Sequence, residues 1–294
     1  MKHVFGVEAD LDRLDKAIAA AVEGISRRRA RVLIGDGAVF VDGKRCRVAG
    51  RSLRAGSRVV VHEGAEPEAP VEVPILFEDD TIVVVNKPAG VHVNETETSP
   101  RRSLEWILSE RNVHVVHRLD VDTTGVLAFA KTKKAAADLS RAFAEQRVHK
   151  VYFAVTEGAP TPGTVDAPIG ADRRRPRAKA VSPKGKPSQT DVEVVATVDG
   201  LAAVVARPRT GRTHQIRVHL SHVGTPIAGD VLYGGHAAGS VGGTIVDFSR
   251  PLLHAARLIL PEGRTFDAPL PADLEALGPA GLLFPDTAGL ASSA

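Results

Sequence analysis

Residues 116–127, which read VHRLDVDTTGVL, bring two carboxylates, a histidine and an arginine together in one short polar stretch. The stretch runs directly into an apolar strand pattern, and functional residues often lie in such loops. A carboxylate there can take part in nucleophilic or acid–base chemistry. Asp120 and Asp122 could equally be turn residues whose side chains cap neighbouring backbone amides. The stretch by itself leaves both interpretations open.

A second polar stretch, residues 209–222, reads RTGRTHQIRVHLSH. Its first part predicts a turn, with Thr213 as the N-cap of a helix. The spacing of Ile216, Leu220 and Val223 then predicts one apolar helix face. Arg217 lies near the start of this helix, where a carboxylate from elsewhere in the chain could pair with it.

Several other chemistries lack their sequence signatures. The histidines at 214, 219 and 222 do not share one helix face and no HExxH pattern occurs, so we expect no metal site. The chain also lacks a GxSxG elbow for a serine nucleophile and the glycine-rich loops that hold nucleotides. Cys46 is the only cysteine, which excludes an internal disulfide and gives no zinc-ligand spacing. We therefore expect neither a metal nor a cofactor.

Residues 1–63 are expected to form a small α+β domain. Apolar residues near its start recur at helical spacing, and Ser26 is expected to cap a second, arginine-rich helix. An Asp-Gly turn at 42–43 then predicts a β-hairpin, after which a further short strand follows. The next stretch is acidic, contains two prolines and has no apolar periodicity, so it predicts a linker over residues 64–73.

The remaining chain predicts a larger α+β domain over residues 74–277. Two helix patterns, at 103–111 and 133–146, alternate with β-rich runs whose neighbours are joined by turns rather than by regular βαβ units. We therefore expect a mainly antiparallel mixed sheet flanked by helices. The expected strands are residues 75–77, 82–85, 126–130, 150–156, 190–197 and 201–206. Residues 278–294, rich in Ala, Gly, Ser and Leu, predict a flexible tail.

Composition and charge narrow the class of protein. The 294 residues are 43% hydrophobic and 25% charged, which is typical of a globular protein. No stretch has the roughly 18 apolar residues of a membrane span, and the N-terminus lacks the apolar core of a signal peptide, so we expect a cytoplasmic protein. The net charge of +3 is uneven, with +7 over residues 11–61 and +6 over residues 172–186. Two basic regions suggest a polyanionic partner such as nucleic acid, although a solvated surface explains charge runs equally simply.

Four separated motifs resemble the RluA class of RNA pseudouridine synthases. They are HRLDVDTTG at 117–125, Lys150-Val151-Tyr152, GRTHQIRVH at 211–219 and GTPIAGDVLYG at 224–234. Residues 78–90 and 253–255 are also similar to the family, so the resemblance covers about residues 74–275. Val121 stands where the family often has Arg, and Thr124 where Ser is usual. The resemblance implies a pseudouridine synthase catalytic domain over residues 74–277.

The N-terminal segment resembles the alpha-L RNA-binding motif, the S-four-type domain that often precedes this catalytic domain. Residues 13–18, RLDKAI, and residues 26–44 match its pattern. The resemblance implies a surface that binds RNA phosphates, since Arg and Lys neutralise phosphates without reading the base sequence. The residues expected to do so are Arg13, Arg27, Arg28, Arg31 and Lys44.

The family resemblance also implies roles for individual residues of the larger domain. Asp120 matches the essential carboxylate, which acts either as a nucleophile on the ribose or as a base at its 2′ position. Arg217 matches the basic residue that pairs with this aspartate. Tyr152 matches the aromatic residue that stacks on the target base and helps to remove a proton. The reaction breaks the glycosidic bond, turns the uracil and rejoins it through carbon 5, so it requires no cofactor.

Further residues are expected to bind the substrate. Arg118 matches a family residue that fills the gap left by a flipped uridine. His117 could orient the loop or be structural. Arg212, His214 and Gln215 are expected to frame Arg217, and hydrogen bonding at the helix start is the simpler interpretation of all three.

The sequence thus predicts a monomeric RNA pseudouridine synthase with a separate RNA-binding domain and no membrane partner. Large-subunit ribosomal RNA is the expected target, and transfer RNA is the alternative. Two hypotheses from other classes stay open: a non-catalytic RNA-binding or ribosome-assembly protein that retains the fold, and a hydrolase that uses Asp120 and a histidine and releases uracil. The basic run at 172–186 could help to select the RNA or could be a solvated loop.

Overall fold

The computed structural model describes residues 1–46, 48–63, 71–94, 103–176 and 178–286. The chain divides into two units, one made of Met1–Glu72 and His92–Arg111, the other of Val73–Val91 and Asn112–Ala294. Each unit has its own apolar core. Within the described ranges, none of the helices combines the length and the apolarity needed to cross a membrane. The predicted linker, residues 64–73, lies mostly outside the described residues.

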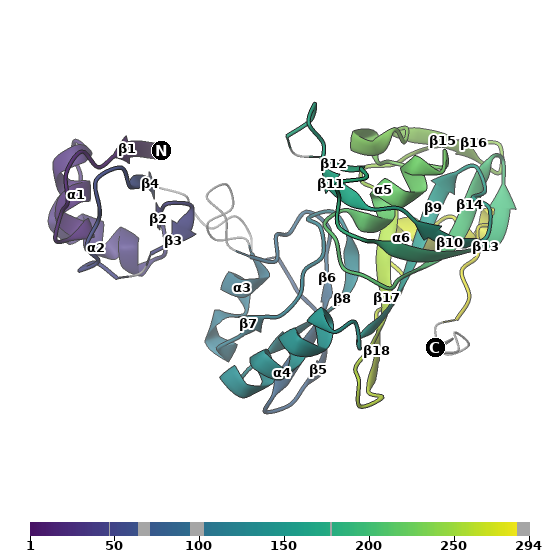
Figure 1. Cartoon of the computed structure of the whole chain (residues 1–294), viewed down its shortest axis with the longest axis horizontal. Helices are drawn as coiled ribbons and strands as arrows, with labels where there is room; N and C mark the ends of the chain where they lie inside the picture. The colour runs from purple at the N-terminus through teal and green to yellow at the C-terminus, as the bar shows by residue number, and fades with distance from the viewer. Residues whose placement is uncertain (47, 64–70, 95–102, 177, 287–294) are drawn as a thin grey trace. The chain divides into compact units, whose positions relative to one another are not determined.

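The first unit contains a four-stranded antiparallel sheet with the strand order β1-β4-β2-β3 and two longer helices (Figure 1). Its elements are β1 (Lys2–Gly6), α1 (Leu14–Ala21), α2 (Arg27–Gly35), β2 (Val39–Val41), β3 (Lys44–Arg45), β4 (Arg58–His62), α3 (Leu104–Ile107) and the 3-10 helix η1 (Ser109–Arg111). Ser26 caps α2 as predicted, because its Oγ accepts a hydrogen bond from the backbone N–H of Arg29 at 3.2 Å. Asp42 and Gly43 both have positive φ, as a tight hairpin turn requires.

The core of the first unit confirms the helical spacing seen in the sequence. Leu14 and Ile18 of α1 and Leu33 of α2 are at most 2% exposed, and they pack with the valines of β2 and β4. The strand β1, which the sequence did not predict, pairs along its whole length with β4. Two helices and four short strands therefore share one small apolar core.

The second unit is built on a ten-stranded sheet with the continuous order β10-β13-β14-β9-β17-β8-β6-β5, in which β18 also pairs with β17 and β7 with β8. Its strands are β5 (Ile75–Glu78), β6 (Ile82–Lys87), β7 (His114–Val115), β8 (Thr124–Ala130), β9 (His149–Glu157), β10 (Gly163–Asp166), β13 (Gln189–Val198), β14 (Leu201–Pro208), β17 (Leu253–Ile259) and β18 (Thr265–Asp267). All of these pairs are antiparallel except β17 with β8. The expected α+β class with a mainly antiparallel mixed sheet is therefore confirmed.

Two hairpins and several helices complete the second unit. The hairpins are β11 (Ile169–Ala171) with β12 (Lys179–Val181), and β15 (Ala238–Val241) with β16 (Thr244–Asp247). The helices are α4 (Lys133–Ala144), α5 (Gln215–His222), η2 (Val231–Tyr233), α6 (Ala272–Glu275) and η3 (Gly278–Ala280). The longer two lie along the sheet: α4 packs against β7 and β8, and α5 packs against β12, β13 and β14.

The start of α5 differs from the prediction. His214, not Thr213, occupies the N-cap position, and it does so with a φ of 58° and without a side-chain capping bond. Left-handed backbone is uncommon for a residue other than glycine, and such residues cluster at functional sites. Ile216 and Leu220 are buried on the helix face as predicted, but Val223 follows the helix as its C-cap and is 42% exposed.

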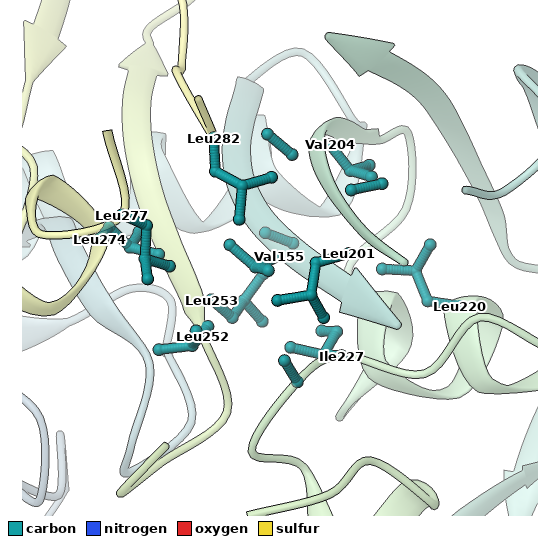
Figure 2. Close-up of a cluster of buried hydrophobic side chains, with 14 of the residues drawn as sticks. Val155, Leu201, Val204, Leu220, Ile227, Leu252, Leu253, Leu274, Leu277 and Leu282 are labelled. Carbon is teal, nitrogen blue, oxygen red and sulfur yellow. The ribbon is translucent and has the colours of Figure 1, made fainter. Parts of the chain in front are cut away.

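The main core of the second unit joins β9, β14, α5 and the C-terminal segment (Figure 2). Val155, Leu201 and Leu220 meet there with Leu282, which is fully buried. The ring of Phe284 also stacks on Phe153, with the ring centroids 4.8 Å apart. Leu282 and Phe284 of the predicted flexible tail are therefore packed against the core, where burial of apolar area offsets the entropy of ordering the chain, while Leu283 between them is exposed. Residues 287–294 lie outside the described residues.

Candidate active site

The loop that holds Asp120, residues 117–123, precedes β8 and enters the middle of the large sheet. Strand β8 pairs with β6 on one side and with β17 on the other. The Asp120 side chain is 23% exposed, so a ligand can reach its carboxylate. Gly125 has a φ of 113°, and a Cβ at this position would lie 2.2 Å from the carbonyl oxygen of Ala255. The loop therefore needs glycine where it joins the sheet.

Arg217 of α5 is shared between two carboxylates. Its Nη1 donates to Oδ2 of Asp120 at 3.2 Å, and its Nε and Nη2 donate to the two carboxylate oxygens of Asp230 at 2.6 and 2.8 Å. Burial alone would lower the pKa of Arg217, but the hydrogen bonds and charges of the two aspartates raise this pKa above its usual value. The predicted pairing of Arg217 with Asp120 is thus present in the structure.

Asp230 is a member of the site to which the sequence analysis assigned no role. It lies just before η2 in the motif at 224–234, and its side chain is only 1% exposed. Its two-point bond fixes the plane of the Arg217 guanidinium and so directs the remaining nitrogen toward Asp120. The available signal was a carboxylate in a glycine-rich turn, but its partner depends on the tertiary structure.

His214 and Tyr233 form a second connection to Asp120. The Nε2 of His214 lies 3.9 Å from Oδ1 of Asp120, and its Nδ1 is hydrogen-bonded to Oη of Tyr233 at 2.7 Å. The same Oη accepts a hydrogen bond from the backbone N–H of Lys179 in β12 at 2.9 Å. Burial lowers the pKa of His214, against the opposing charge of Asp120, so the imidazole is neutral near pH 7. This network connects Asp120 with the hairpin β11–β12.

Tyr152 lies on β9, directly opposite Ala255 of β17. Burial raises the pKa of the phenol, and the negative charge of Asp120 raises it further. A phenol that stays protonated can stack on a base and donate a hydrogen bond, and its expected part in proton removal stays a prediction. Lys150, two residues earlier, donates to the carbonyl oxygen of Thr210 at 3.1 Å and so joins β9 to the segment that leads into α5.

Two residues that were expected to bind the substrate are engaged within the protein. The Nε2 of His117 accepts a hydrogen bond from the backbone N–H of Ala128 at 3.0 Å, and its ring stacks on Phe143. Burial lowers the pKa of His117 to about 3, so the ring stays neutral, as a hydrogen-bond acceptor must. Gln215 is buried, and its amide makes four hydrogen bonds of 2.7–3.0 Å to neighbouring protein groups. The structure favours the structural interpretation of both.

Other predicted residues are accessible to a ligand. Arg118 is exposed in the same loop as Asp120. Arg212 donates its Nε to the carbonyl oxygen of Pro187 at 3.2 Å and is otherwise partly exposed. In the first unit, Arg28 and Lys44 are exposed. The exposed guanidinium and ammonium groups can meet phosphates without first breaking a buried contact.

The remaining arginines predicted to bind RNA surround one buried carboxylate in the first unit. Asp15 is fully buried, and Arg13, Arg27 and Arg31 donate to it at 2.9, 3.2 and 2.8 Å. Their hydrogen bonds, led by that of Arg13, hold the pKa of Asp15 well below its usual range although burial opposes this. Since the three side chains are still 38–55% exposed, the cluster presents a net positive charge to solvent.

The arrangement in the second unit offers an accessible carboxylate, held by an arginine, beside a neutral histidine and a neutral phenol. Such a carboxylate can attack an electrophilic carbon or accept a proton from a substrate brought to it. Among the residues that the structure describes, no three His, Cys, Asp or Glu side chains are grouped so that they could hold a metal ion.

Comparison with protein families gives two matches. The profile of the RNA pseudouridylate synthase family matches residues 81–222, and that of the S4 domain matches residues 12–59. The first range contains Asp120, Tyr152 and Arg217, and the second contains the arginine cluster around Asp15.

Known proteins similar to this chain carry the same description. An uncharacterized RNA pseudouridine synthase of Chloroflexus aurantiacus is 37% identical over 90% of this chain and 88% of its own length. Ribosomal large subunit pseudouridine synthase D of Vibrio vulnificus is 34% identical over 89% of this chain and 88% of its own length. Among solved structures, human RNA pseudouridylate synthase domain containing 4 aligns with a TM-score of 0.59 and 30% identity, over 72% of this chain and 95% of that one.

Proposed function

Because the chain belongs to the RNA pseudouridine synthase family, we propose that it converts uridine to pseudouridine in large-subunit ribosomal RNA, with Asp120 as the reactive carboxylate. The observation that carries the assignment of Asp120 is its bond to Arg217, which Asp230 holds in place. A carboxylate that is both fixed and accessible can be brought against the ribose of a bound nucleotide.

The proposed reaction rearranges the bonds of one nucleotide. The bond between C1′ of the ribose and N1 of the base breaks, the uracil turns, a bond forms between C1′ and C5, and the proton on C5 is lost as N1 gains one. Asp120 acts at the sugar, either by attacking C1′ or by accepting the proton at C2′. Arg217 balances the charge of the carboxylate and holds one of its oxygens at 3.2 Å, which leaves the other oxygen for the substrate.

The neighbouring side chains contact the uracil and hold the flipped nucleotide in place. Tyr152 presents a neutral aromatic ring on which the uracil stacks while it is detached. Arg118, exposed in the same loop, fills the space that the flipped uridine leaves in the RNA, which offsets part of the few kcal/mol of lost stacking. His214 faces Asp120 as a neutral imidazole and positions the hairpin β11–β12 through Tyr233.

Ribosomal RNA is the favoured target, for two reasons. Relatives along most of the chain are named ribosomal large subunit pseudouridine synthase D, and the S4 domain supplies a second, basic binding unit. A surface that binds phosphates without reading bases suits a large folded RNA, in which the shape around the target uridine selects the site. The enzyme acts in the cytoplasm as a monomer, and transfer RNA is the alternative substrate.

The test is incubation of the purified protein with unmodified ribosomal and transfer RNA transcripts, followed by carbodiimide mapping of pseudouridine. Asp120→Asn is measured in parallel. We expect pseudouridine at discrete positions of the large-subunit RNA and none with the variant. Modification of transfer RNA alone would show that transfer RNA, not ribosomal RNA, is the substrate. Release of free uracil would identify a hydrolase. RNA binding without any product would favour a non-catalytic RNA-binding protein.

A further inference from the structure

The backbone that follows Asp120 is held by two buried cations. The carbonyl oxygens of Val121, Asp122 and Thr123 are consecutive, and each accepts a hydrogen bond from Lys87 or Arg250. No motif that pointed to the reaction suggested a role for either cation. Lys87 is the last residue of β6, and Arg250 lies three residues before β17; these two strands flank β8.

Lys87 binds the loop from the side of β6. Its Nζ donates to the carbonyl oxygens of Val121 at 2.7 Å, Thr123 at 2.9 Å and Pro88 at 2.9 Å. An ammonium group has three hydrogens, so all of its donors are used. Lys87 is fully buried, and burial lowers its pKa to about 7, while the three carbonyl oxygens around Nζ favour the charged ammonium form.

Arg250 binds the loop from the side of β17. Its Nη1 lies 3.1 Å from the carbonyl oxygen of Asp122, and it also donates to the carbonyl oxygens of Pro251 and Leu253. Its Nε and Nη2 donate to the carboxylate of Asp273 at 2.7 and 2.9 Å. The side chain is only 5% exposed, so Asp273, in α6, is its charge partner and fixes its plane.

Burial of two cations is unfavourable unless each is paired or fully hydrogen-bonded. The loop before β8 is irregular backbone, and its carbonyl groups have no neighbouring strand in the described part of the chain to donate hydrogen bonds to them. Here the charged side chains of Lys87 and Arg250 donate those bonds. Charge-assisted bonds are shorter and stronger than neutral ones, so they restrict the loop more tightly. The loop that is restricted in this way begins one residue after Asp120.

We infer that Lys87 and Arg250 are positioning residues that fix the carboxylate of Asp120 through its backbone, and that Asp273 acts on the reaction through Arg250. The inference rests on the proposed role of Asp120. The inference assigns a function to Asp273, which is far from Asp120 in the sequence. Since a displacement of about 1 Å at a reacting group can lower a rate about 100-fold, a loosened loop should reduce turnover rather than binding.

The test compares Asp273→Asn with Asp267→Asn. Asp267 makes a similar two-point bond, to Arg257 at 2.6 and 3.0 Å, and its side chain is 38% exposed against 36% for Asp273. Arg257 lies on β17, and the two atoms by which it holds Asp267 bond no part of the Asp120 loop. The two variants therefore break matched ion pairs, and Asp273→Asn breaks the pair whose arginine is bonded to the loop.

We expect Asp273→Asn to lower kcat at least about tenfold with a KM for RNA within about twofold of the wild-type value, because the loss is one of positioning. Asp267→Asn should leave kcat within about twofold. Asp273→Glu, which keeps the charge, should recover part of kcat and shows whether loss of folding explains the first result. A kcat that Asp273→Asn leaves unchanged, or that falls equally in both Asn variants, would overturn the inference.

A second readout does not depend on activity. Amide hydrogen exchange of the peptide that spans residues 117–128 should become faster in Asp273→Asn and stay at the wild-type rate in Asp267→Asn. Equal exchange in the two variants would overturn the inference that Lys87 and Arg250 fix the loop after Asp120. If the wild-type protein modifies no RNA while the exchange result holds, the proposed function has failed, but the inference that Lys87 and Arg250 fix the loop has not.

Discussion

The guanidinium of Arg217 bonds both Asp120 and Asp230, so a substitution of Arg217 affects both carboxylates. Asp230 is almost fully buried and would be left without its partner, and an unpaired buried charge costs about 3–5 kcal/mol of stability. A simple truncation of Arg217 would therefore mix a folding defect with a defect in the reaction. A second substitution at Asp230 separates the two effects.

We predict that the double variant Arg217→Ala, Asp230→Asn folds and loses at least about 100-fold in single-turnover rate, while its RNA dissociation constant changes less than about threefold. The reason is that Arg217 orients Asp120 but does not lie among the exposed residues expected to bind RNA. Rate and affinity are measured on the same transcript. Asp230→Asn alone is the control and should lose less rate, and equal losses of rate and affinity in the double variant would contradict the positioning role.

At the scale of elements, the Asp120 loop depends on how β8 joins its neighbours. The single parallel pair of the large sheet, β17 with β8, brings His254 opposite Thr124, and the hydroxyl of Thr124 is 2.8 Å from Nδ1 of His254. Gly125 follows at a point where the backbone of Ala255 leaves no room for a side chain. The geometry of this junction therefore determines where the loop ends.

We predict that Gly125→Ala destabilises the protein by more than about 3 kcal/mol, because the new Cβ overlaps the backbone of Ala255 and the φ of 113° is strained for alanine. Thermal unfolding measures the change. Gly163→Ala is the matched control: its φ is 137°, but nothing lies within 4 Å of the new Cβ, so only the conformational cost of about 1–3 kcal/mol remains. Equal destabilisation of the two variants would show that the steric contact is unimportant.

His117 joins the same loop to β8 and α4, and its burial makes this connection sensitive to acid. The pKa of His117 is lowered to about 3 in the folded protein, whereas an unfolded histidine titrates near 6.5, so the unfolded state binds more protons between these values. Stability is therefore lost as the pH falls below about 6.5. From pH 7 to pH 5 this histidine should cost the folded state up to about 2 kcal/mol.

The measurement is the free energy of unfolding by urea at pH 7 and pH 5, for wild type and for His117→Gln. Glutamine can still accept the bond from Ala128 but does not titrate. We expect the variant to be less stable at pH 7 and to show a smaller pH dependence. An unchanged dependence would mean that His117 is protonated without loss of the fold.

At the scale of the whole molecule, binding and chemistry are assigned to different units. The first unit gathers positive charge, in part by holding three arginines on the buried Asp15. The second unit holds Asp120 and Tyr152, which are proposed to touch the reacting nucleotide, and Arg217, which holds Asp120. Substitutions in the first unit should therefore affect how tightly RNA is held more than how fast a bound uridine reacts.

We predict that Arg28→Gln with Lys44→Gln weakens RNA binding and reduces the slope of log affinity against log salt by roughly 1.5–2, since each cation releases about one counterion from the RNA. Both residues are exposed, so stability should stay within about 0.5 kcal/mol of the wild-type value. Single-turnover rate at saturating RNA should not change. An unchanged salt slope would exclude Arg28 and Lys44 from the RNA contact.

Much of the architecture could be predicted from local pattern. Ser26 caps α2, the Asp42-Gly43 turn makes its hairpin, and the helix pattern at 133–146 becomes α4, because capping, turn geometry and helical periodicity are properties of neighbouring residues. The strands β1, β7, β10 through β12 and β15 through β18 were not predicted. Several of them are short or lie at edges, where alternation of polar and apolar residues is weak.

The sequence by itself determined the α+β class, the two basic regions, the loop that carries Asp120 and, through its motifs, the kind of reaction. Only the tertiary structure decided which charges meet: Asp230 and Asp120 on Arg217, Lys87 and Arg250 on the backbone after Asp120, and three arginines on Asp15. The physical reason is that capping and periodicity act over a few residues. The pairing of buried charges depends instead on which distant segments the packed sheet brings together, and a linear sequence does not contain that information in readable form.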